Sequence, residues 1–256
     1  MSKDTILFLE TTIQGERIFG EIARKNQIQR NLNGKKVCSS TFVLNQFQNT
    51  FLSSAIDYYN LLVDSENPHT ALRRSTKYRE RIHKRITQIF ATLCDEVEND
   101  NDAALERLET WITDGLMIEF YKNIEEPLIN KTSCCWVSGE PIKVGNRYEI
   151  KVYCRKNNPP NCNIRDFWNV HKGELKCLST SNILSKSNDR ELKKVCEVAA
   201  IIKDGNDSPY GKNCHIHLSD ALISVESPRE SQIYTTNKKH FEPICKVIGR
   251  KLYRED

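Results

Sequence analysis

Polar side chains follow two short, largely apolar runs at opposite ends of the chain. Three polar residues follow each run directly: Glu10, Thr11 and Thr12 after residues 5–9, and Thr235, Thr236 and Asn237 after residues 232–234. If both runs are parallel strands of one open α/β sheet, their carboxyl ends meet at the edge where sites are built. Asp220, on a predicted short helix, adds a second carboxylate. Such oxygens bind Mg²⁺ or Mn²⁺, so this pattern predicts a metal and phosphate site.

The residues around the first run alternate between strand and helix patterns. Residues 14–29 have apolar residues at helical spacing, and Asn33-Gly34 marks a turn. Residues 35–38 predict a second strand, with Ser39 and Ser40 as candidate helix caps. From Thr41 onward, apolar residues recur every three or four positions and predict a long amphipathic helix: Leu44, Phe47, Phe51, Ala55, Tyr58 and Leu62. This rhythm predicts an α/β fold with a parallel sheet.

The end of the chain continues the alternation. Asn188 is a predicted cap for a helix with Glu191 at the capping-box position. Asp220 lies on the next helix, and His217, one turn earlier, could approach a phosphate or satisfy the helix start. After the run 232–234, the basic residues Lys238, Lys239 and His240 begin a helix that contacts either a nucleic-acid backbone or only solvent.

Four stretches, taken in order, resemble the PIN-domain family of metal-dependent nucleases. They are ILFLETTI near the start, SSTFVLNQF in the first quarter, and HLSDALI and YTTNKKHF near the end. The resemblance covers residues 1–63 and 205–252. It implies a three-layer α/β sandwich with a central parallel sheet. It also implies a cluster of acids that holds Mg²⁺ or Mn²⁺ and cleaves phosphodiester bonds.

The resemblance assigns four site positions. These fall on Glu10, Gln46, Asp220 and Asn237, of which Glu10, Asp220 and Asn237 are the implied metal ligands. Thr12 and Thr235 or Thr236 match small hydroxyl residues that support the family's site. The family usually has a shorter acid at the first position and glutamate at the second, so only two positions keep a charge here. A PIN-like scaffold without catalysis therefore stays as the alternative.

Residues 64–187 predict an insertion in a single domain whose core is 1–63 and 188–256. Its first half reads as a helical hairpin, and one helical face there is basic: Arg74, Lys77, Arg81, Lys84 and Arg85. Such a face is either a solvated surface or a stripe that contacts phosphates beside the site. A hairpin is predicted around Gly145-Asn146.

Cysteines and one histidine gather in the second half of this insertion: Cys134, Cys135, Cys154, Cys162, Cys177 and His171. Structural zinc sites usually show paired cysteines two to four residues apart, and no such pair exists here. Buried free thiols are therefore the favoured interpretation, with zinc as the lesser alternative.

Composition sets the broad class. With 256 residues, 28% charged residues and a mean hydropathy of -0.58, we expect a cytoplasmic protein without a membrane segment. The ten cysteines do not indicate a disulfide framework, because such frameworks belong to small secreted domains. A net charge of +4 permits a nucleic-acid partner without requiring one.

The sequence thus predicts a Mg²⁺- or Mn²⁺-dependent endonuclease, with RNA as the favoured substrate. The rival is a catalytically inactive PIN-like module that binds nucleic acid or a partner protein, and a third reading is a zinc-stabilised regulatory protein. A toxin with its antitoxin, a defence effector and a subunit of an RNA-processing complex all fit this prediction.

Overall fold

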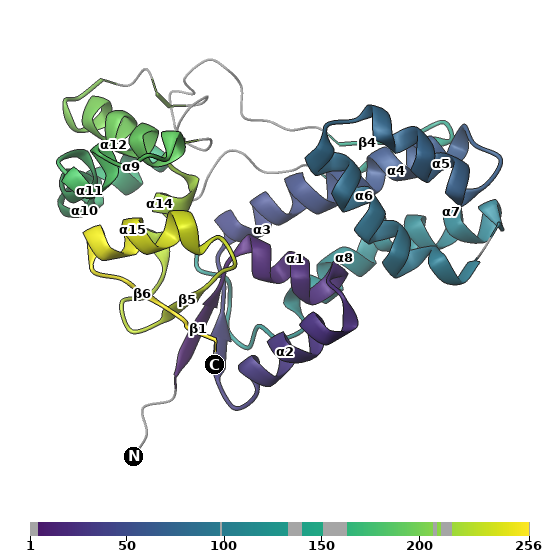
Figure 1. The fold of residues 1–256 in the computed structure, drawn as a ribbon, viewed down its shortest axis with the longest axis horizontal. Coiled ribbons are helices and arrows are strands. Elements are labelled where there is room, and N and C mark those ends of the chain that lie inside the picture. The colour runs from purple at the N-terminus through teal and green to yellow at the C-terminus, as the bar shows by residue number, and fades with distance from the viewer. Residues whose placement is uncertain are drawn as a thin grey trace.

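Four parallel strands form the central sheet of the protein. The computed structural model describes residues 5–97, 99–132, 140–150, 163–206, 209–210 and 217–255 (Figure 1). The strands, in the spatial order β2-β1-β5-β6, are β2 (Lys36–Cys38), β1 (Ile6–Leu9), β5 (Gln232–Tyr234) and β6 (Lys251–Leu252). Every neighbouring pair is parallel, which confirms the predicted α/β fold with a parallel sheet.

Strand β1 lies at the centre because it is apolar on both faces. Leu7, Phe8 and Leu9 are fully buried. Successive side chains of a strand point to opposite faces. Phe8 accordingly packs in the large core, whereas Leu7 and Leu9 belong to a smaller core with Ile13. A strand that is buried on both faces needs neighbours on both edges, and β2 and β5 provide them.

Helices cover the sheet from two sides. Helices α1 (Thr11–Phe19) and α2 (Ile22–Leu32) lie on one side, and α14 (Ser219–Glu226) and α15 (Lys238–Ile248) lie on the other (Figure 1). This arrangement is compatible with the three layers expected. The prediction of a single helix over residues 14–29 is wrong in its bounds. The chain is already helical at Thr11, and it breaks at Gly20, where the backbone is extended.

The long helix expected from Thr41 is present as three consecutive segments. They are α3 (Thr41–Phe47), the π-helical turn η1 (Gln48–Leu52) and α4 (Ser53–Val63). The Ser40 hydroxyl accepts a hydrogen bond from the Val43 N–H, so the predicted cap is confirmed. Phe51, in the π-helical turn, stacks on Phe19 with ring centroids 5.2 Å apart. These contacts attach the long helix to α1.

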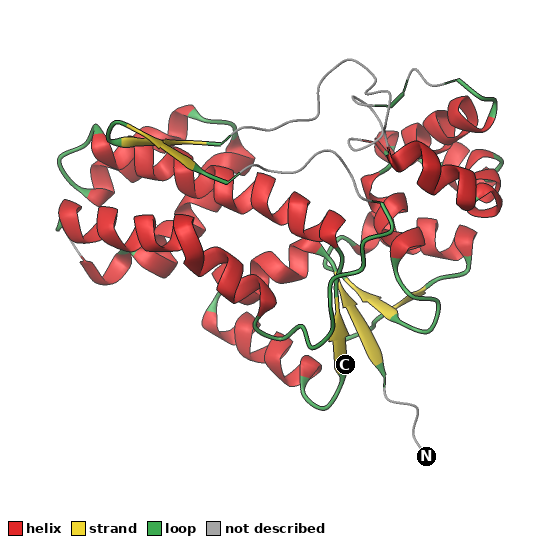
Figure 2. Ribbon diagram, turned by 180° about the vertical axis from the view of Figure 1, so that it is seen from behind, coloured by secondary structure: helices red, strands yellow, loops and turns green. Residues whose placement is uncertain are grey.

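A helical lobe follows α4 in the chain. It contains α5 (Pro68–Arg74), η2 (Ser75–Lys77), α6 (Glu80–Leu93), η3 (Asp95–Val97), α7 (Asn101–Thr110), η4 (Trp111–Gly115) and α8 (Leu116–Tyr121). The first expected helix of the hairpin is therefore broken, because Tyr78 is extended between η2 and α6. The predicted turn at Gly145 is confirmed by the hairpin of β3 (Ile142–Val144) and β4 (Arg147–Glu149), which packs on this lobe in Figure 2.

The second half of the expected insertion is more helical than its composition suggests. It contains α9 (Asn163–Val170), α10 (Lys172–Ser179) and α11 (Asn182–Ser185), which are followed by α12 (Arg190–Lys203). The cap of α12 is Asp189 and not Asn188, because Asp189 Oδ1 accepts hydrogen bonds from the N–H groups of Glu191 and Leu192. Most of these elements form the green lobe of Figure 1.

The expected insertion also closes one edge of the sheet. The Ile129 N–H donates to the Ser39 carbonyl (3.0 Å), and the Thr41 N–H donates to the Ile129 carbonyl (2.9 Å). Arg17 adds a buried link from α1 to the end of α8, because its Nη2 donates to the carbonyls of Glu119 and Phe120. The sheet and the helical lobe therefore share one packed core. No helix of the described residues is long and apolar enough to cross a membrane.

Gly15 is the position where this packing is tightest, and Gly15→Ala should destabilise the protein. A Cβ there would lie 2.2 Å from Cζ of Phe51. The Phe51 ring is held by Phe19 and Phe47, with centroid distances of 5.2 and 5.1 Å, and has little room to move. We expect a loss of about 1–3 kcal/mol in the free energy of unfolding, measured with urea.

Gly173→Ala is the matched control. Gly173 is also helical, but a Cβ there meets nothing within 4 Å. That variant should gain about 0.5–1 kcal/mol from the reduced freedom of the unfolded chain. Equal effects of the two substitutions would contradict the packing described for Phe51.

Candidate functional site

The candidate site lies where the order of the strands reverses direction. The chain passes from β1 to β2 on one side, and β5 pairs with the other side of β1. The Glu10 N–H donates to the Tyr234 carbonyl (3.1 Å), so the ends of β1 and β5 are adjacent. Ligands in open α/β sheets bind outside the carboxyl ends of the strands at such a switch point. Glu10 and Thr235 are the first residues beyond these two ends.

The Glu10 carboxylate is buried and tightly held. It caps α1, and its Oε2 accepts hydrogen bonds from the Thr12 N–H (2.9 Å) and the Thr12 hydroxyl (2.6 Å). The Thr235 hydroxyl donates to the same oxygen at 3.0 Å. The Thr236 N–H donates to Thr12 Oγ1 (3.1 Å). The two polar clusters that follow β1 and β5 are therefore joined around one carboxylate.

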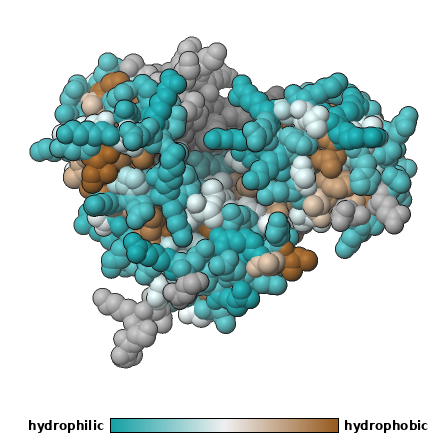
Figure 3. All heavy atoms as spheres, in the orientation of Figure 1, coloured by the Kyte–Doolittle hydropathy of each residue, from teal (hydrophilic) through white to brown (hydrophobic). Residues whose placement is uncertain are grey.

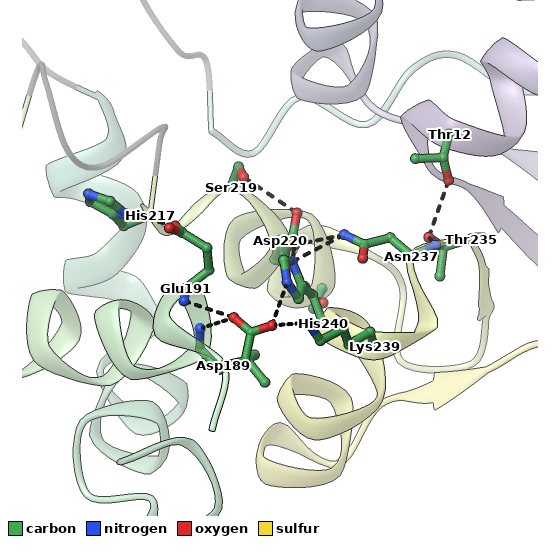
Figure 4. Close-up of polar contacts among 12 residues, drawn as sticks. Thr12, Asp189, Glu191, His217, Ser219, Asp220, Thr235, Asn237, Lys239 and His240 are labelled. Carbon is green, nitrogen blue, oxygen red and sulfur yellow. Dashed lines mark hydrogen bonds and ion pairs between the residues drawn. The ribbon is translucent and has the colours of Figure 1, made fainter. Parts of the chain in front are cut away.

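Asp220 provides the second carboxylate, in the first turn of α14. Its Oδ2 accepts a hydrogen bond from Asn237 Nδ2 (3.2 Å) and lies 3.2 Å from His240 Nδ1 (Figure 4). The Asn237 N–H donates to Thr235 Oγ1 at 3.0 Å. A continuous set of hydrogen bonds thus connects Glu10 to Asp220 through Thr235 and Asn237.

The two carboxylates influence each other electrostatically. Burial, together with the negative charge of Asp220, raises the pKa of Glu10 to about 7 even though Thr12 and Thr235 donate to it. The hydrogen bond to Asp220, and the charges of Asp220 and Asp189, raise the pKa of His240. Near neutral pH this site therefore gains stability from added positive charge.

Asp189 extends the site from the N-terminus of α12. Its Oδ2 lies 2.5 Å from Lys239 Nζ and 3.4 Å from His240 Nε2. The hydrogen bond from Lys239 lowers the pKa of Asp189 to about 2. His240 thus bridges the carboxylates of Asp189 and Asp220, as Figure 4 shows. His240 lies one turn after Asn237 at the start of α15. This spacing of three residues is the sequence signal that could have indicated its contact with Asp220.

These side chains lie beside a cleft of ≈ 620 Å³. Asp220, Asn237 and His240 line one part of it, and Arg81 and Arg85 of α6 line another. Neither arginine has an ion-pair partner among the described residues. The cleft therefore presents carboxylates and unpaired guanidinium groups together. The face of the molecule seen in Figure 3 is mostly hydrophilic.

The other predicted site residues lie outside the hydrogen bonds that connect Glu10 to Asp220. Gln46 Oε1 accepts a hydrogen bond from the Thr11 hydroxyl (2.8 Å) and no hydrogen bond links it to the two carboxylates in the described part of the chain. His217 Nδ1 lies 3.3 Å from Glu191 Oε2, and both residues line the cleft. Lys238 is exposed and lines a separate groove with Lys246.

The expected basic stripe does not face the cleft as a unit, so that prediction is wrong. Of its five members, only Arg81 and Arg85 line the cleft. Arg74 donates to the Asp64 carbonyl and to Ser65 Oγ, and Lys84 lines a different cavity. Lys77 is exposed in η2. The physical reason is the break at Tyr78, which gives α5 and α6 different axes.

The oxygen donors fit a hard divalent cation. No group of three His, Cys, Asp or Glu residues within the described ranges is arranged to hold a metal. Mg²⁺, however, is usually bound by one or two carboxylates and completes its shell with water and substrate phosphate. Glu10 and Asp220 satisfy that requirement, and the Asn237 amide can add a neutral oxygen.

The zinc prediction falls mostly on residues outside the described part of the chain, namely Cys134, Cys135, Cys154 and Cys162. Cys177 is exposed, and His171 Nδ1 lies 3.7 Å from Glu174. The cysteines of the described ranges are free thiols, most of them buried. No family model, curated protein or solved structure matches this chain. Function must therefore be argued from the site.

The raised pKa of Glu10 makes stability depend on pH in metal-free buffer. Below pH 4.5 the carboxyl is protonated in both the folded and the unfolded state, so its contribution is fully present. From pH 4.5 to about 7 only the unfolded state ionises readily, so the free energy of unfolding falls. Glu10→Gln should remove this fall and exceed wild type at pH 8 by up to about 3 kcal/mol.

Denaturant unfolding from pH 4 to pH 8 in EDTA tests this expectation. The raised pKa of His240 adds a loss in the same direction, and that part persists in the variant. Glu242→Gln is the control, because Glu242 is exposed on α15 away from the buried pair. If Glu10→Gln follows the wild-type profile, the Glu10 carboxyl is not the titrating group.

Proposed function

We propose that this protein is a Mg²⁺- or Mn²⁺-dependent nuclease of PIN-like organisation, with RNA as the favoured substrate. The observation that supports it most is the pair of carboxylates, Glu10 and Asp220, at the switch point of a parallel sheet. The pair is close enough for the Asp220 charge to raise the pKa of Glu10. A like-charge pair in which Glu10 is buried is unfavourable by itself and becomes favourable when a cation shares it.

Glu10, Asp220 and Asn237 would hold the cation. When bound, it lowers the pKa of a water and offsets charge on the leaving oxygen. The chain's own residues position the ligands. Thr12 and Thr235 fix the Glu10 carboxylate by hydrogen bonds to Oε2, and His240 fixes Asp220. Such outer contacts orient ligands and strongly affect metal affinity.

The composition of the cleft suits a polyanionic substrate. A cleft that carried only carboxylates would repel phosphodiesters, whereas here Arg81 and Arg85 lie in the same cavity as Asp220. The net charge of +4 adds a weak attraction over distance. The preference for RNA rests on the resemblance to the PIN family, because metal and phosphate chemistry does not read the sugar.

A second candidate is a catalytically silent PIN-like module that binds nucleic acid or a partner protein, such as an antitoxin or a complex subunit. One observation favours it. Oδ2 of Asp220 already accepts a hydrogen bond from Asn237 and lies 3.2 Å from His240. With two carboxylates and a histidine that has a raised pKa, the site is partly neutralised without a metal.

Comparing RNA cleavage by wild type and by Asp220→Asn should distinguish the nuclease from the catalytically silent module. This substitution keeps the shape of the side chain and removes its charge. We expect Mn²⁺- or Mg²⁺-dependent cleavage of a labelled RNA to fall at least about hundredfold, since even outer contacts of metal ligands are worth 10–100-fold. Labelled single-stranded DNA in parallel reactions identifies the preferred sugar.

Asp204→Asn is the matched control, because Asp204 is exposed and pairs with Lys203 at the far end of α12. Its activity should equal that of wild type. Failure of wild type to cleave either substrate, together with no thermal stabilisation by Mn²⁺, would reject the nuclease and favour the silent module.

A further inference from the structure

Two guanidinium groups in the cleft beside the carboxylates are without an anion. Arg81 and Arg85 lie four residues apart in α6, so they are neighbours on one face of that helix. Both line the cleft. Arg81 is exposed, whereas Arg85 is half-buried. Neither forms a hydrogen bond or an ion pair with a residue that the structure describes.

Two other arginines show how this chain satisfies a guanidinium that is withdrawn from water. The buried Arg17 donates from Nη2 to the Phe120 carbonyl (3.1 Å), and the half-buried Arg250 donates from Nη2 to the Val225 carbonyl (2.9 Å). Arg85 is half-buried as well, but it has no such acceptor among the described residues. A charged group that loses water without gaining a partner has a free-energy cost. Arg85 therefore needs an acceptor.

The charges near Arg85 increase this need. Burial and the positive charge of Arg81 lower the pKa of Arg85. No carboxylate of the described residues contributes to this shift. Asp220 thus does not offset the charge of Arg85, although both residues line the cleft. The arginine pair and the carboxylates are two separate charged places within one cleft, and an anion at the first place is not the group held at the second.

We infer, on the basis of the proposed function, that Arg81 and Arg85 form a subsite for a phosphodiester next to the one that is cleaved. A guanidinium presents a planar fork of donors that matches phosphate oxygens. A phosphate at this subsite supplies the acceptors that Arg85 lacks and offsets the repulsion from Arg81. A strand that reaches both places carries two successive phosphodiesters. The substrate class is therefore an oligonucleotide strand, and a dinucleotide with a single phosphodiester is a poor substrate.

Lys84 provides a matched control on the same helix. It is the neighbour of Arg85 in the sequence, it is exposed, and it carries the same charge. It lines a different cavity, with Ile22 and Lys25 of α2. Replacing Lys84 or an arginine by glutamine changes the net charge equally. A difference between these variants therefore reports contact with the strand and not the overall charge of the protein.

Binding of a labelled, short single-stranded RNA in EDTA tests the inference, because cleavage requires the metal and binding by arginine does not. Fluorescence anisotropy at several salt concentrations gives the affinity and its salt dependence. Arg81→Gln/Arg85→Gln should weaken binding at least about tenfold, because contacts to a charged group are lost. The slope of log affinity against log salt should become shallower by about 0.7, the value for one phosphate of a single strand.

Lys84→Gln should leave affinity and slope as in wild type. Arg81→Gln alone changes only an exposed side chain and should weaken binding in the same direction, so the test remains decisive if the double variant does not fold. The inference is overturned if the arginine variants bind RNA as Lys84→Gln does, or if wild type does not bind RNA.

Chain length tests the subsite in the cleavage reaction with Mn²⁺. Wild type should cleave a trinucleotide with a kcat/KM at least about tenfold above that of a dinucleotide, because only the trinucleotide offers a second phosphodiester to the arginines. The double arginine variant should lose this preference. Equal cleavage of both lengths by wild type contradicts the subsite.

The two assays distinguish failure of the subsite from failure of the nuclease. Cleavage that depends on Asp220, together with unchanged RNA binding in the arginine variants, rejects the subsite and leaves the nuclease standing. Absence of cleavage by wild type, together with weaker binding and a shallower salt slope in the arginine variants, rejects the nuclease. In that case the arginines hold a phosphodiester in a silent binding module.

Discussion

The buried carboxylate of Glu10 is the constraint on which the site depends. One oxygen, Oε2, caps α1 and accepts hydrogen bonds from the hydroxyls of Thr12 and Thr235. It therefore connects the residues that follow β1 to those that follow β5. Burial and the charge of Asp220 raise its pKa to about 7. The fold therefore stabilises an arrangement that is unfavourable without added positive charge. Strongly shifted pKa values of this kind are typical of functional sites.

Three strands, β1, β2 and β5, were predictable because each contains neighbouring apolar residues and is followed directly by polar ones. Strand β6 was not predicted, because it has only two residues, Lys251 and Leu252. Apolar spacing likewise predicted the long helix that begins at Thr41, and the Gly145-Asn146 pair predicted the turn of the β3–β4 hairpin. The break at Tyr78 was not predictable, because no glycine or proline marks it and only packing decides the axis of α6. The helices within 163–185 were missed because each is short, and short helices depend on tertiary contacts more than on sequence pattern.

Within the site, strand ends indicated Glu10 and Asn237, and the resemblance to a known family indicated Asp220. The role of Asp189 was not predictable. It reaches His240 because the N-terminus of α12 lies beside the first turn of α15. Nothing in the sequence between residues 189 and 240 fixes that distance. Arg85 was grouped with a basic face, and only the orientation of α6 shows that it lines the cleft with Arg81.

The central position of β1 has a consequence for synthesis. Thr235 lies 225 residues after Glu10, yet its hydroxyl donates to the Glu10 carboxylate. During synthesis, β1 keeps one edge unpaired until β5 follows. Contacts this distant in sequence slow folding and leave strand edges open to aggregation. A nascent chain thus cannot complete the hydrogen bonds around Glu10 before Thr235 has been synthesised.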